Sequence, residues 1–581
     1  MNFLEGLNPD QADGAMADGN CLITACPGSG KSKTLANKAA RLLSAQNTVC
    51  AVSFTKDSAI ELREKILSLA GGDKAPKKLL TAGTFHSLCL KQIGGGVQAM
   101  ASEGDKVGMV KRALQSTGLE GDFTPEDAMR VIERVKNSRI KLPDNDPHGQ
   151  LFRSYQDLLT RNKKIDFQDL VINAVEGMKT GAVKPFNVEY MLVDEFQDAD
   201  QLQLEWVMLH AKAGVKVTVV GDDDQSIYGF RQALGYAGME SFATEFNAKK
   251  VVLAINYRCH EEILSHAGKL IVSNKTRIPK ALQAAKGPGG TIGFKQFLSK
   301  EKEAQTIAEA YCDVIRTQES YAVISRNNRK LDPVESCLIS YGIPYFKAGG
   351  GSFLDRYEVS LLFDLIRFSI GASTTGMDNA LAWAGMAEDD LKAIHKKFGH
   401  QLIRGSKQDL EDSGVSEDGR ALWREFVKRS QGWIKAATTD RFNLLITGIR
   451  EWLNEQAETK FQIENIEMAS DLLCRLKGTL QERMDLLSKN NRKEPPEGPH
   501  IVLITMHSSK GLEWDHVWII ASEETVIPDE KSSVEEERRL MYVAMTRARK
   551  DLMMSSSGSN PVSRFVIEAQ VPNLTMPQSL N

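Results

Sequence analysis

The stretch Ala25–Ser32, with the sequence ACPGSGKS, decides the fold of this chain. It follows the short apolar run Cys21–Ile23 and precedes Lys33–Leu43, which has the pattern of a helix. Glycines in such a loop let the backbone turn tightly with its N–H groups pointing inward, where a phosphate chain rests on them and on the helix N-terminus. The order of strand, loop and helix therefore predicts a phosphate-binding loop at the carboxyl edge of a sheet.

Each residue type in this loop has a chemical role. Gly28 and Gly30 allow the turn, Lys31 is expected to reach the β- and γ-phosphates, and Ser32 to place its hydroxyl on Mg²⁺. Ala25 stands where the usual pattern has its first glycine. The alternative is a glycine turn that binds nothing, and the correct order of strand, loop and helix argues against it.

Length and composition limit the possible classes of protein. A chain of 581 residues is too long for one hydrophobic core, so several domains are expected. Hydrophobic residues at 42% and charged residues at 26% are typical of a soluble globular protein. The formal net charge is −3, so any contact with nucleic acid must follow a local basic path.

The cysteines and the N-terminal sequence bear on the compartment. The eight cysteines are scattered, with no paired spacing that would build a zinc site, and they indicate reduced thiols. The N-terminus lacks a basic region followed by an apolar one, and no run of about 18 apolar residues occurs. We therefore expect a cytoplasmic protein that neither crosses nor contacts a membrane.

Two further strand–helix units follow the phosphate loop. Thr48–Thr55 is an apolar, β-branched run of strand length, and the residues after it have helical spacing. Leu79–Leu90 supplies a third strand that ends in the polar and aromatic cluster Thr84–Ser87. His86 in that cluster, taken alone, would be a structural histidine.

Later strands end in carboxylates. Asp194 and Glu195 follow the buried run Tyr190–Val193, and in a phosphate-loop protein the first can hold Mg²⁺ while the second accepts the proton of an attacking water. An exposed acidic strand end is the alternative. Lys216–Ala233 contains a fourth strand that ends in three aspartates and Gln225, an amide suited to a γ-phosphate or its attacking water.

The rest of the chain alternates between helical and mixed character. Residues 90–165 predict a basic helical insertion, and charge alone leaves nucleic-acid contact and a solvated face equally open. Its basic residues are Lys106, Lys111, Arg112, Arg130, Arg134, Lys136, Arg139 and Lys141. Lys286–Gly290 has the composition of a joint, after which strands and helices predict a second α/β domain. Residues 373–497 are helical in pattern, and Val534–Leu552 is expected to form a helix that carries Arg547.

These motifs, in this order, resemble those of the UvrD/Rep/PcrA-like helicases of superfamily 1. LNPDQ is similar to the Q motif, ACPGSGKS to motif I, AVSFTKDSAIELREKI to motif Ia, GTFHS to motif Ib, VDEFQD to motif II and VVGDDDQSIYGFRQA to motif III. NYR resembles motif IV, AVISRNN with GGGSFLDRYEV the motif after it, ITMHSSKGLEWDHV motif V and YVAMTRAR motif VI. The resemblance covers nearly the whole chain.

The resemblance implies an α/β fold of two RecA-like parallel-sheet domains, each with an inserted helical domain. ATP is expected in the cleft between the two domains and single-stranded DNA across their top. The expected bounds are 1–89 and 166–280 for the first sheet domain with its insertion at 90–165, and 281–372 and 498–581 for the second with its insertion at 373–497.

The resemblance also implies roles for individual residues. The nucleotide contacts are expected to be Gln11, Ala25, Cys26, Pro27, Gly28, Ser29, Gly30, Lys31, Ser32, Lys33, Tyr257 and Glu513, with Ser32 and Asp194 as Mg²⁺ ligands. The catalytic set is Glu195 as base, Gln225 as γ-phosphate sensor, and the arginines Arg258 and Arg547. The expected DNA contacts are Phe54, Thr84, His86, Tyr228, Phe230, Arg326, Asn327, Thr505 and His507.

Several positions depart from the family pattern. Lys33 stands where an arginine is usual beside the adenine, and Phe230 replaces a tryptophan. A Gly-Ile-Gly turn for duplex DNA is missing, with Gly385–Leu391 as its nearest counterpart. The residues after motif VI, Met553–Ala569, leave no room for a projecting β-hairpin with an aromatic tip, so we expect that hairpin to be absent or vestigial. The alternative is that another segment, such as Thr525–Ser533, supplies it.

Two functions remain open at this stage. The first is an ATP-driven helicase or translocase that moves 3′ to 5′ and engages single-stranded DNA and single-strand/duplex junctions as a monomer. The second is a translocase that strips proteins from single strands and unwinds little. A motor fused to a nuclease is disfavoured because no carboxylate–lysine cluster follows motif VI.

Overall fold

The structure is a computed structural model that describes residues 3–94, 99–138, 142–313, 316–373, 375–398, 414–490 and 494–573. The chain forms two compact units. Unit 1 comprises Met1–Ile292, Pro528–Lys550 and Arg564–Val571, and unit 2 comprises Gly293–Ile527, Asp551–Ser563 and Pro572–Asn581. Unit 1 thus includes two C-terminal segments that the sequence analysis assigned to the second sheet domain. Among the described residues, no helix is long and apolar enough to span a bilayer.

Unit 1 is built on a six-stranded parallel sheet with the order β3-β2-β6-β7-β1-β8. Its strands are β1 (Cys21–Ala25), β2 (Val49–Ser53), β3 (Leu80–Thr84), β6 (Tyr190–Val193), β7 (Lys216–Gly221) and β8 (Lys249–Leu253). β1, β2 and β6 are buried along their whole length, as expected when helices cover both faces of a parallel sheet.

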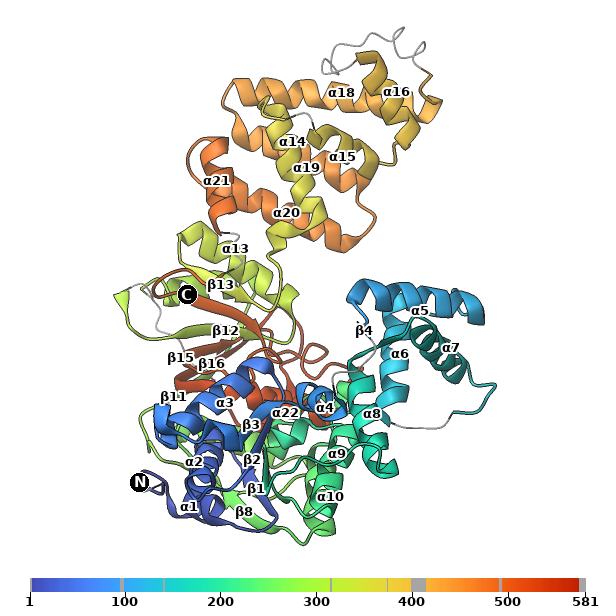
Figure 1. The fold of residues 1–581 in the computed structure, drawn as a ribbon. Coiled ribbons are helices and arrows are strands. Elements are labelled where there is room, and N and C mark those ends of the chain that lie inside the picture. Colours follow the sequence, from blue (N-terminus) through green and yellow to red (C-terminus); the bar gives the residue numbers. More distant parts are fainter. Residues whose placement is uncertain are drawn as a thin grey trace. The chain divides into compact units, whose positions relative to one another are not determined.

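Helices cover both faces of this sheet (Figure 1). One face packs against α2 (Lys31–Ser44) and α3 (Lys56–Leu69), and the other against α4, α8, α9 and α10. These four helices are Phe85–Ile93, Phe167–Thr180, Gln201–Lys212 and Gly235–Glu245. Successive strand residues point to opposite faces of the sheet. Leu22 packs in the core beneath α4, α8, α9 and α10, and Ile23 packs in the core beneath α2 and α3. Both neighbours of the phosphate loop are therefore fixed by apolar packing.

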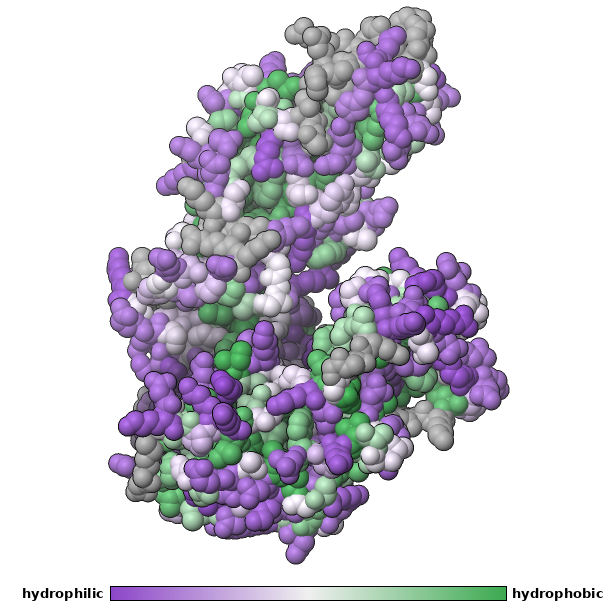
Figure 2. Space-filling model, viewed as in Figure 1, coloured by the Kyte–Doolittle hydropathy of each residue, from purple (hydrophilic) through white to green (hydrophobic). Residues whose placement is uncertain are grey.

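In the part of the chain between α4 and α8 that the structure describes, three helices pack around an apolar core of their own. They are α5 (Glu103–Thr117), α6 (Pro125–Ser138) and α7 (Pro147–Arg161), and their core includes Val110 and Tyr155. The visible face of this cluster is largely hydrophilic (Figure 2).

One residue of the predicted basic face is internal. The Nζ of Lys136 lies 2.7 Å from Asp166 and 2.8 Å from Asp169, and its side chain is 1% exposed. Its charge balances two buried carboxylates, so the assignment of Lys136 to a basic surface was wrong. Arg139 and Lys141 lie outside the described residues.

Unit 2 contains a second six-stranded sheet with the order β11-β16-β15-β12-β14-β13. Its strands are β11 (Thr291–Phe297), β12 (Tyr321–Ser325), β13 (Tyr345–Ala348), β14 (Ile501–Thr505), β15 (Trp514–Ile519) and β16 (Ala548–Ser557). β15, β12, β14 and β13 run parallel. The two parallel sheets confirm the α/β fold class.

β16 corrects one prediction. The sequence pattern predicted a helix over Val534–Leu552, but α22 spans only Val534–Met545 and β16 begins at Ala548. Leu552 and Met554 are fully buried at a spacing of two residues, so burial in a strand outweighs the local helix propensity. Arg547 therefore lies between a helix and a strand.

The helices of residues 357–490 share an apolar core with the second sheet. They are α14 (Tyr357–Ser369), α15 (Thr375–Trp383), α16 (Glu388–Phe398), α18 (Glu417–Thr438), α19 (Phe442–Gln456), α20 (Lys460–Arg475) and α21 (Leu480–Asn490). Trp423, Trp433 and Trp452 belong to the same continuous cluster as Val323 of β12 and Leu338 of α13 (Asp332–Tyr341).

The segment after β16 forms a turn. β16 ends at Ser557, residues 558–560 turn, and Val562 makes a single antiparallel bridge to Glu523 before α23 (Arg564–Glu568). Residues 525–533, the alternative site for a hairpin, also contain no strand. Within 494–573, the absence of a strand hairpin with an aromatic tip after motif VI is confirmed.

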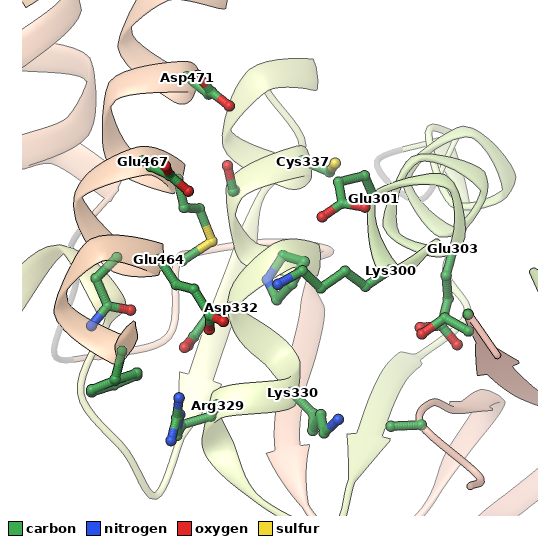
Figure 3. Close-up of a pocket in the computed structure, with 18 of the residues that line it drawn as sticks. Lys300, Glu301, Glu303, Arg329, Lys330, Asp332, Cys337, Glu464, Glu467 and Asp471 are labelled. Atoms are coloured by element: carbon green, nitrogen blue, oxygen red, sulfur yellow. The ribbon is translucent and has the colours of Figure 1, made fainter. Parts of the chain in front are cut away.

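A cavity of about 640 Å³ lies within unit 2 (Figure 3). Glu464, Glu467 and Asp471 project from α20 toward the helix that carries Asp332 and Cys337. The buried carboxylates in its wall are satisfied internally. Asp332 pairs with Lys347 and Arg356, and Glu303 of α12 (Lys300–Ala310) accepts a hydrogen bond of 2.5 Å from Ser555. We therefore assign this cavity no ligand.

Glu303 provides a test of the packing in unit 2. Burial and the nearby charge of Glu523 raise its pKa to about 7, although the Ser555 hydrogen bond opposes the shift. Because the pKa of Glu303 is higher in the folded protein than in the unfolded chain, ionisation of Glu303 opposes folding. The free energy of unfolding therefore falls as the pH rises from the pKa of the unfolded state to that of the folded state.

We expect Glu303→Gln to stabilise the protein more at pH 8 than at pH 5, by up to about 2 kcal/mol. Thermal melting at both pH values measures this difference. Glu301→Gln, which removes an exposed carboxylate from the same helix, is the matched control. An equal effect of Glu303→Gln at both pH values would contradict the assignment of a buried, titrating Glu303.

Candidate nucleotide-binding site

Four segments of unit 1 meet where the parallel strands of its sheet end. The phosphate loop follows β1, Asp194 and Glu195 follow β6, and the loop 222–225 follows β7. Residues 256–258 come after β8. In the register, Ala25 lies opposite Leu253 and Thr24 opposite Gly221, so these strand ends reach the same edge. Such an edge is where ligands bind in open α/β sheets.

The phosphate loop requires glycine at two positions. Gly28 and Gly30 have φ angles of +62° and +77°, a region that favours glycine. A Cβ on Gly28 would lie 2.6 Å from the Cβ of Arg258, and one on Gly30 would lie 2.8 Å from Nε2 of Gln11. The loop therefore packs directly against two residues of the predicted nucleotide site.

The loop side chains meet the two carboxylates after β6. The Nζ of Lys31 lies 3.0 Å from Glu195, and the hydroxyl of Ser32 donates to Asp194 over 3.1 Å. Glu195 has a φ of +50°, a strained conformation for a residue with a side chain. Glu195, the predicted base, thus has a strained backbone and an oppositely charged neighbour.

Burial and charge shift the pKa values of this group. Burial and the charge of Glu195 raise the pKa of Asp194 to about 6, although Lys31 opposes the shift. Burial alone would lower the pKa of Lys31, but the charges of Glu195, Asp222 and Asp194 outweigh it and raise that pKa. An arrangement of buried carboxylates around a lysine is suited to a polyanion with a divalent cation.

The predicted sensor and arginines lie together in unit 1. Nε2 of Gln225 donates to Asp222 over 2.6 Å, and a guanidinium nitrogen of Arg547 donates to Oε1 of Gln225 over 3.1 Å. Arg258 donates to the carbonyl of Thr546 over 3.2 Å. The structure thus brings Gln225, Arg258 and Arg547 into one set of contacts, and Arg547 is only 1% exposed.

The predicted adenine side is ordered by α1 (Pro9–Met16). Asn8 caps this helix, and its Nδ2 donates to the hydroxyl of Tyr257 over 2.8 Å. The side chain of Gln11 donates to the carbonyl of Ser29 over 2.8 Å and accepts from the N–H of Asn8 over 3.0 Å. Lys33 donates to the carbonyl of Gly6 over 2.6 Å. Gln11 therefore braces the phosphate loop.

One orphaned atom supports a phosphate ligand. Ser29 is 1% exposed, and its hydroxyl has no hydrogen-bond partner among the described residues. A buried hydroxyl without a partner costs free energy unless a ligand or water satisfies it. Together with the lysine, the hydroxyl of Ser32 and the carboxylates, this donor fits a nucleoside triphosphate and Mg²⁺.

Sequence reasoning missed two buried amides that join the segments. Nδ2 of Asn256 donates to the carbonyl of Pro27 over 2.6 Å, and its Oδ1 accepts from the N–H groups of Arg258 and Cys259. Gln197 donates to Glu195 over 2.5 Å and accepts from the N–H of Asp222 over 3.0 Å. Both lie inside quoted motifs, but only their tertiary contacts show this bracing role.

The predicted DNA contacts of unit 1 lie at ends of strands and in the loop after Gln225. Ser53 pairs with Thr84, and the ring of Phe54 lies 5.3 Å from that of Phe85. The rings of Tyr228 and Phe230 are 6.0 Å apart, and Phe230 is 65% exposed. An aromatic side chain this exposed is available for stacking. His86 makes an edge contact of 5.7 Å with Phe167.

The predicted contacts of unit 2 gather at one edge of the second sheet. Arg326 and Asn327 follow β12, and His507 follows β14. Because Ser325 pairs with Thr505 in parallel register, these residues come from adjacent strand ends. Glu513, predicted as a ribose contact, immediately precedes β15 in the same unit.

The parallel sheet, the phosphate loop and the paired carboxylates define a phosphate-loop nucleotide-binding protein. The family model of the UvrD/REP helicase N-terminal domain matches residues 7–246, and that of the UvrD-like helicase C-terminal domain matches residues 251–379 and 422–559. This chain belongs to the UvrD-like helicases of superfamily 1.

Curated relatives match nearly all of the chain. It is 28% identical to the ATP-dependent DNA helicase PcrA of Staphylococcus epidermidis, over 98% of this chain and 87% of that protein. It is 28% identical to DNA helicase II of Haemophilus influenzae, over 97% and 87% respectively. The PcrA of Staphylococcus aureus is 26% identical, over 97% and 86%.

Substitution of Glu195, the carboxylate next to Lys31, tests the site. We expect Glu195→Gln to lower ATP turnover by about 10²- to 10⁴-fold while nucleotide affinity is largely kept, because an amide cannot accept the proton of water. Steady-state hydrolysis and titration with a fluorescent nucleotide separate the two effects.

Lys31→Ala is the contrasting variant. It removes the side chain expected to contact the phosphates, so hydrolysis should be lost while binding to single-stranded DNA stays largely intact. A loss of nucleotide affinity in Glu195→Gln as large as its loss of turnover would make Glu195 a metal ligand. Near-normal turnover in Lys31→Ala would refute the site itself.

Proposed function

We propose that this chain is an ATP-dependent DNA helicase that steps 3′ to 5′ along single-stranded DNA and engages single-strand/duplex junctions, acting as a monomer. The observation that carries the proposal is the connected site of unit 1. There Lys31 contacts Glu195, Ser32 contacts Asp194, and Arg547 contacts Gln225. Family membership and the names of the relatives support ATP-driven work on DNA.

The nucleotide roles are distributed over the strand ends of unit 1. Ser32 and Asp194 would hold Mg²⁺, which supplies charge neutralisation at the phosphates when bound. Glu195 takes the proton of the attacking water at a carboxylate oxygen, and Gln197 orients that carboxylate by its hydrogen bond. Gln225 and the guanidinium groups of Arg258 and Arg547 are suited to sense and stabilise negative charge on the transferred phosphoryl group.

The DNA roles rest on exposed aromatics and on polar strand ends. Phe230 and Tyr228 offer stacking faces, and Arg231 lies within 5.6 Å of both ring centres. The loop that holds them is anchored because the N–H of Gly229 donates to Glu536 of α22 (Val534–Met545) over 3.0 Å. Stacking tolerates any base, which suits a protein that moves along arbitrary DNA.

The domain assignment follows the same pattern. We assign residues 90–165 and 373–497 as helical insertions into two RecA-like domains. The separate core of α5–α7 supports the first insertion. The apolar core shared by α18–α20 and β12 implies that the second set is fixed firmly to its own sheet.

A second candidate function is favoured by one observation. After β16 the described chain turns at residues 558–560 without forming a projecting hairpin, so it offers no wedge there to split a duplex. A translocase that displaces proteins from single strands requires stepping but no wedge. We therefore expect unwinding by the isolated protein to be weak relative to translocation.

Duplex substrates with a tail of either polarity test direction and unwinding together. Only the 3′-tailed duplex should be opened, and short duplexes more readily than long ones. Displacement of a protein block from single-stranded DNA, measured in parallel, should be faster than unwinding. Processive opening of long duplexes by the purified chain would overturn the weak-unwinding proposal, and preference for a 5′ tail would overturn the direction.

Phe230 tests the stacking surface. Phe230→Ala should weaken binding to single-stranded DNA by about 1–3 kcal/mol and reduce the distance moved per ATP hydrolysed. Fluorescence anisotropy with a dye-labelled oligothymidylate measures the first effect and a translocation assay the second. Tyr341→Ala, at a half-exposed aromatic outside the predicted strand contacts, is the control. Unchanged affinity in Phe230→Ala would remove Phe230 from the DNA path.

A further inference from the structure

Three consecutive aspartates follow β7 in the interior of unit 1. Asp222, Asp223 and Asp224 are each no more than 1% exposed. One carboxylate oxygen from each lies within 4.8 Å of the others, a spacing that would suit a metal ion. Three buried carboxylates repel one another, so the fold must supply positive charge at this point.

Two basic residues of a later segment supply that charge. The ammonium of Lys280 lies 3.1 Å from Asp222, 2.5 Å from Asp223 and 2.9 Å from Asp224, and its side chain is fully buried. Arg277 binds both oxygens of Asp224 over 2.8 and 2.7 Å. Lys280 thus fills the position between the carboxylates that a metal would take.

Electrostatics keep this lysine charged. Burial alone would lower the pKa of Lys280, but the charges of Asp222, Asp224 and Asp223 outweigh it and raise that pKa. Burial would raise the pKa of Asp224, and the hydrogen bond from Arg277 and the charge of Lys280 reverse the shift. Lys280 and Asp224 are therefore an ion pair at neutral pH.

The cluster is joined directly to the predicted catalytic residues. One oxygen of Asp222 accepts from Lys280, and the other accepts from Nε2 of Gln225 over 2.6 Å. The N–H of Asp222 donates to Gln197, the residue that holds Glu195. Oε1 of Gln225, fixed by the Asp222 contact, faces Arg547. A displacement of Asp222 would therefore change the positions of the Gln225, Arg547 and Glu195 side chains together.

We propose that Lys280 is a positioning residue for ATP hydrolysis, because it holds Asp222 so that Gln225 presents its carbonyl oxygen to Arg547. This proposal rests on the proposed function and adds a residue whose ion pairs are with the three aspartates. Arg277 has a narrower role, since its two bonds go to Asp224, whereas the carboxylate that accepts from Gln225 belongs to Asp222. The effect on turnover should therefore be larger for Lys280 than for Arg277.

Lys280→Met in the full chain tests the proposal. We expect kcat for ATP to fall about 10- to 100-fold, as for a displaced catalytic group, with affinity for a fluorescent ATP analogue within about threefold of the wild type. Arg277→Gln should reduce kcat by less. The decisive measurement is a double-mutant cycle, in which Lys280→Met should have little further effect on kcat in a Gln225→Ala background.

The matched control is Lys136→Met. Lys136 is also a buried lysine between two aspartates of unit 1, but its partners Asp166 and Asp169 accept further hydrogen bonds from Tyr155 and Gln156 of α7. Lys136→Met should lower the melting temperature, while kcat for ATP hydrolysis in the absence of DNA should stay near that of the wild type. If Lys280→Met fails to fold, Asp222→Asn carries the same cycle, because it weakens the bond to Lys280 without a change of shape.

Two results would overturn the proposal. One is a wild-type kcat in Lys280→Met or Asp222→Asn. The other is a loss of kcat that is equally large in the presence and absence of the Gln225 side chain. Failure of the proposed function is distinguishable, since in that case Lys31→Ala would retain hydrolysis whatever the outcome at Lys280.

Discussion

The parallel alignment of β1, β6, β7 and β8 is the constraint on which the candidate site depends. Because all four strands run in one direction, the residues that follow them are delivered to one edge of the sheet, although the first and last of them are more than 200 residues apart in sequence. The apolar cores on the two faces fix the strands. Hydrogen bonds from Asn256 and Gln197 then join the loops that emerge from them.

Charge balance is the second organising principle. Unit 1 buries lysines against carboxylates at Lys31, Lys136 and Lys280, and unit 2 does so at Lys347 with Asp332 and Glu335. Buried ion pairs contribute little net stability, but removal of one partner is costly, so such groups fix geometry more than they stabilise. At Lys31 the balance is suited to a change when a polyanion binds. At Lys280 the positive charge is balanced by aspartates of the protein itself.

The sequence was most informative where chemistry and local order coincide. The phosphate loop, the carboxylate pair after β6 and the strands of both sheets other than β16 were predictable. A glycine-rich turn between an apolar run and a helix, for example, has few other uses. The role of Lys136 was not, since burial depends on Asp166 and Asp169, which are about 30 residues away in sequence. For the same reason Lys280, which is 58 residues from Asp222, carries no local signal. The end of α22 was mispredicted because the apolar residues of β16 also fit a helical pattern.

Arg547 joins the contacts of Gln225 to the second sheet through the chain itself. Arg547 contacts Gln225 in unit 1, and the next residue begins β16, which continues into unit 2 as a strand of its sheet. Lys280 likewise contacts the loop after β7 and lies 13 residues before Gly293, where unit 2 begins. A change in the contacts of Gln225 therefore acts on a chain segment that is continuous with the second sheet.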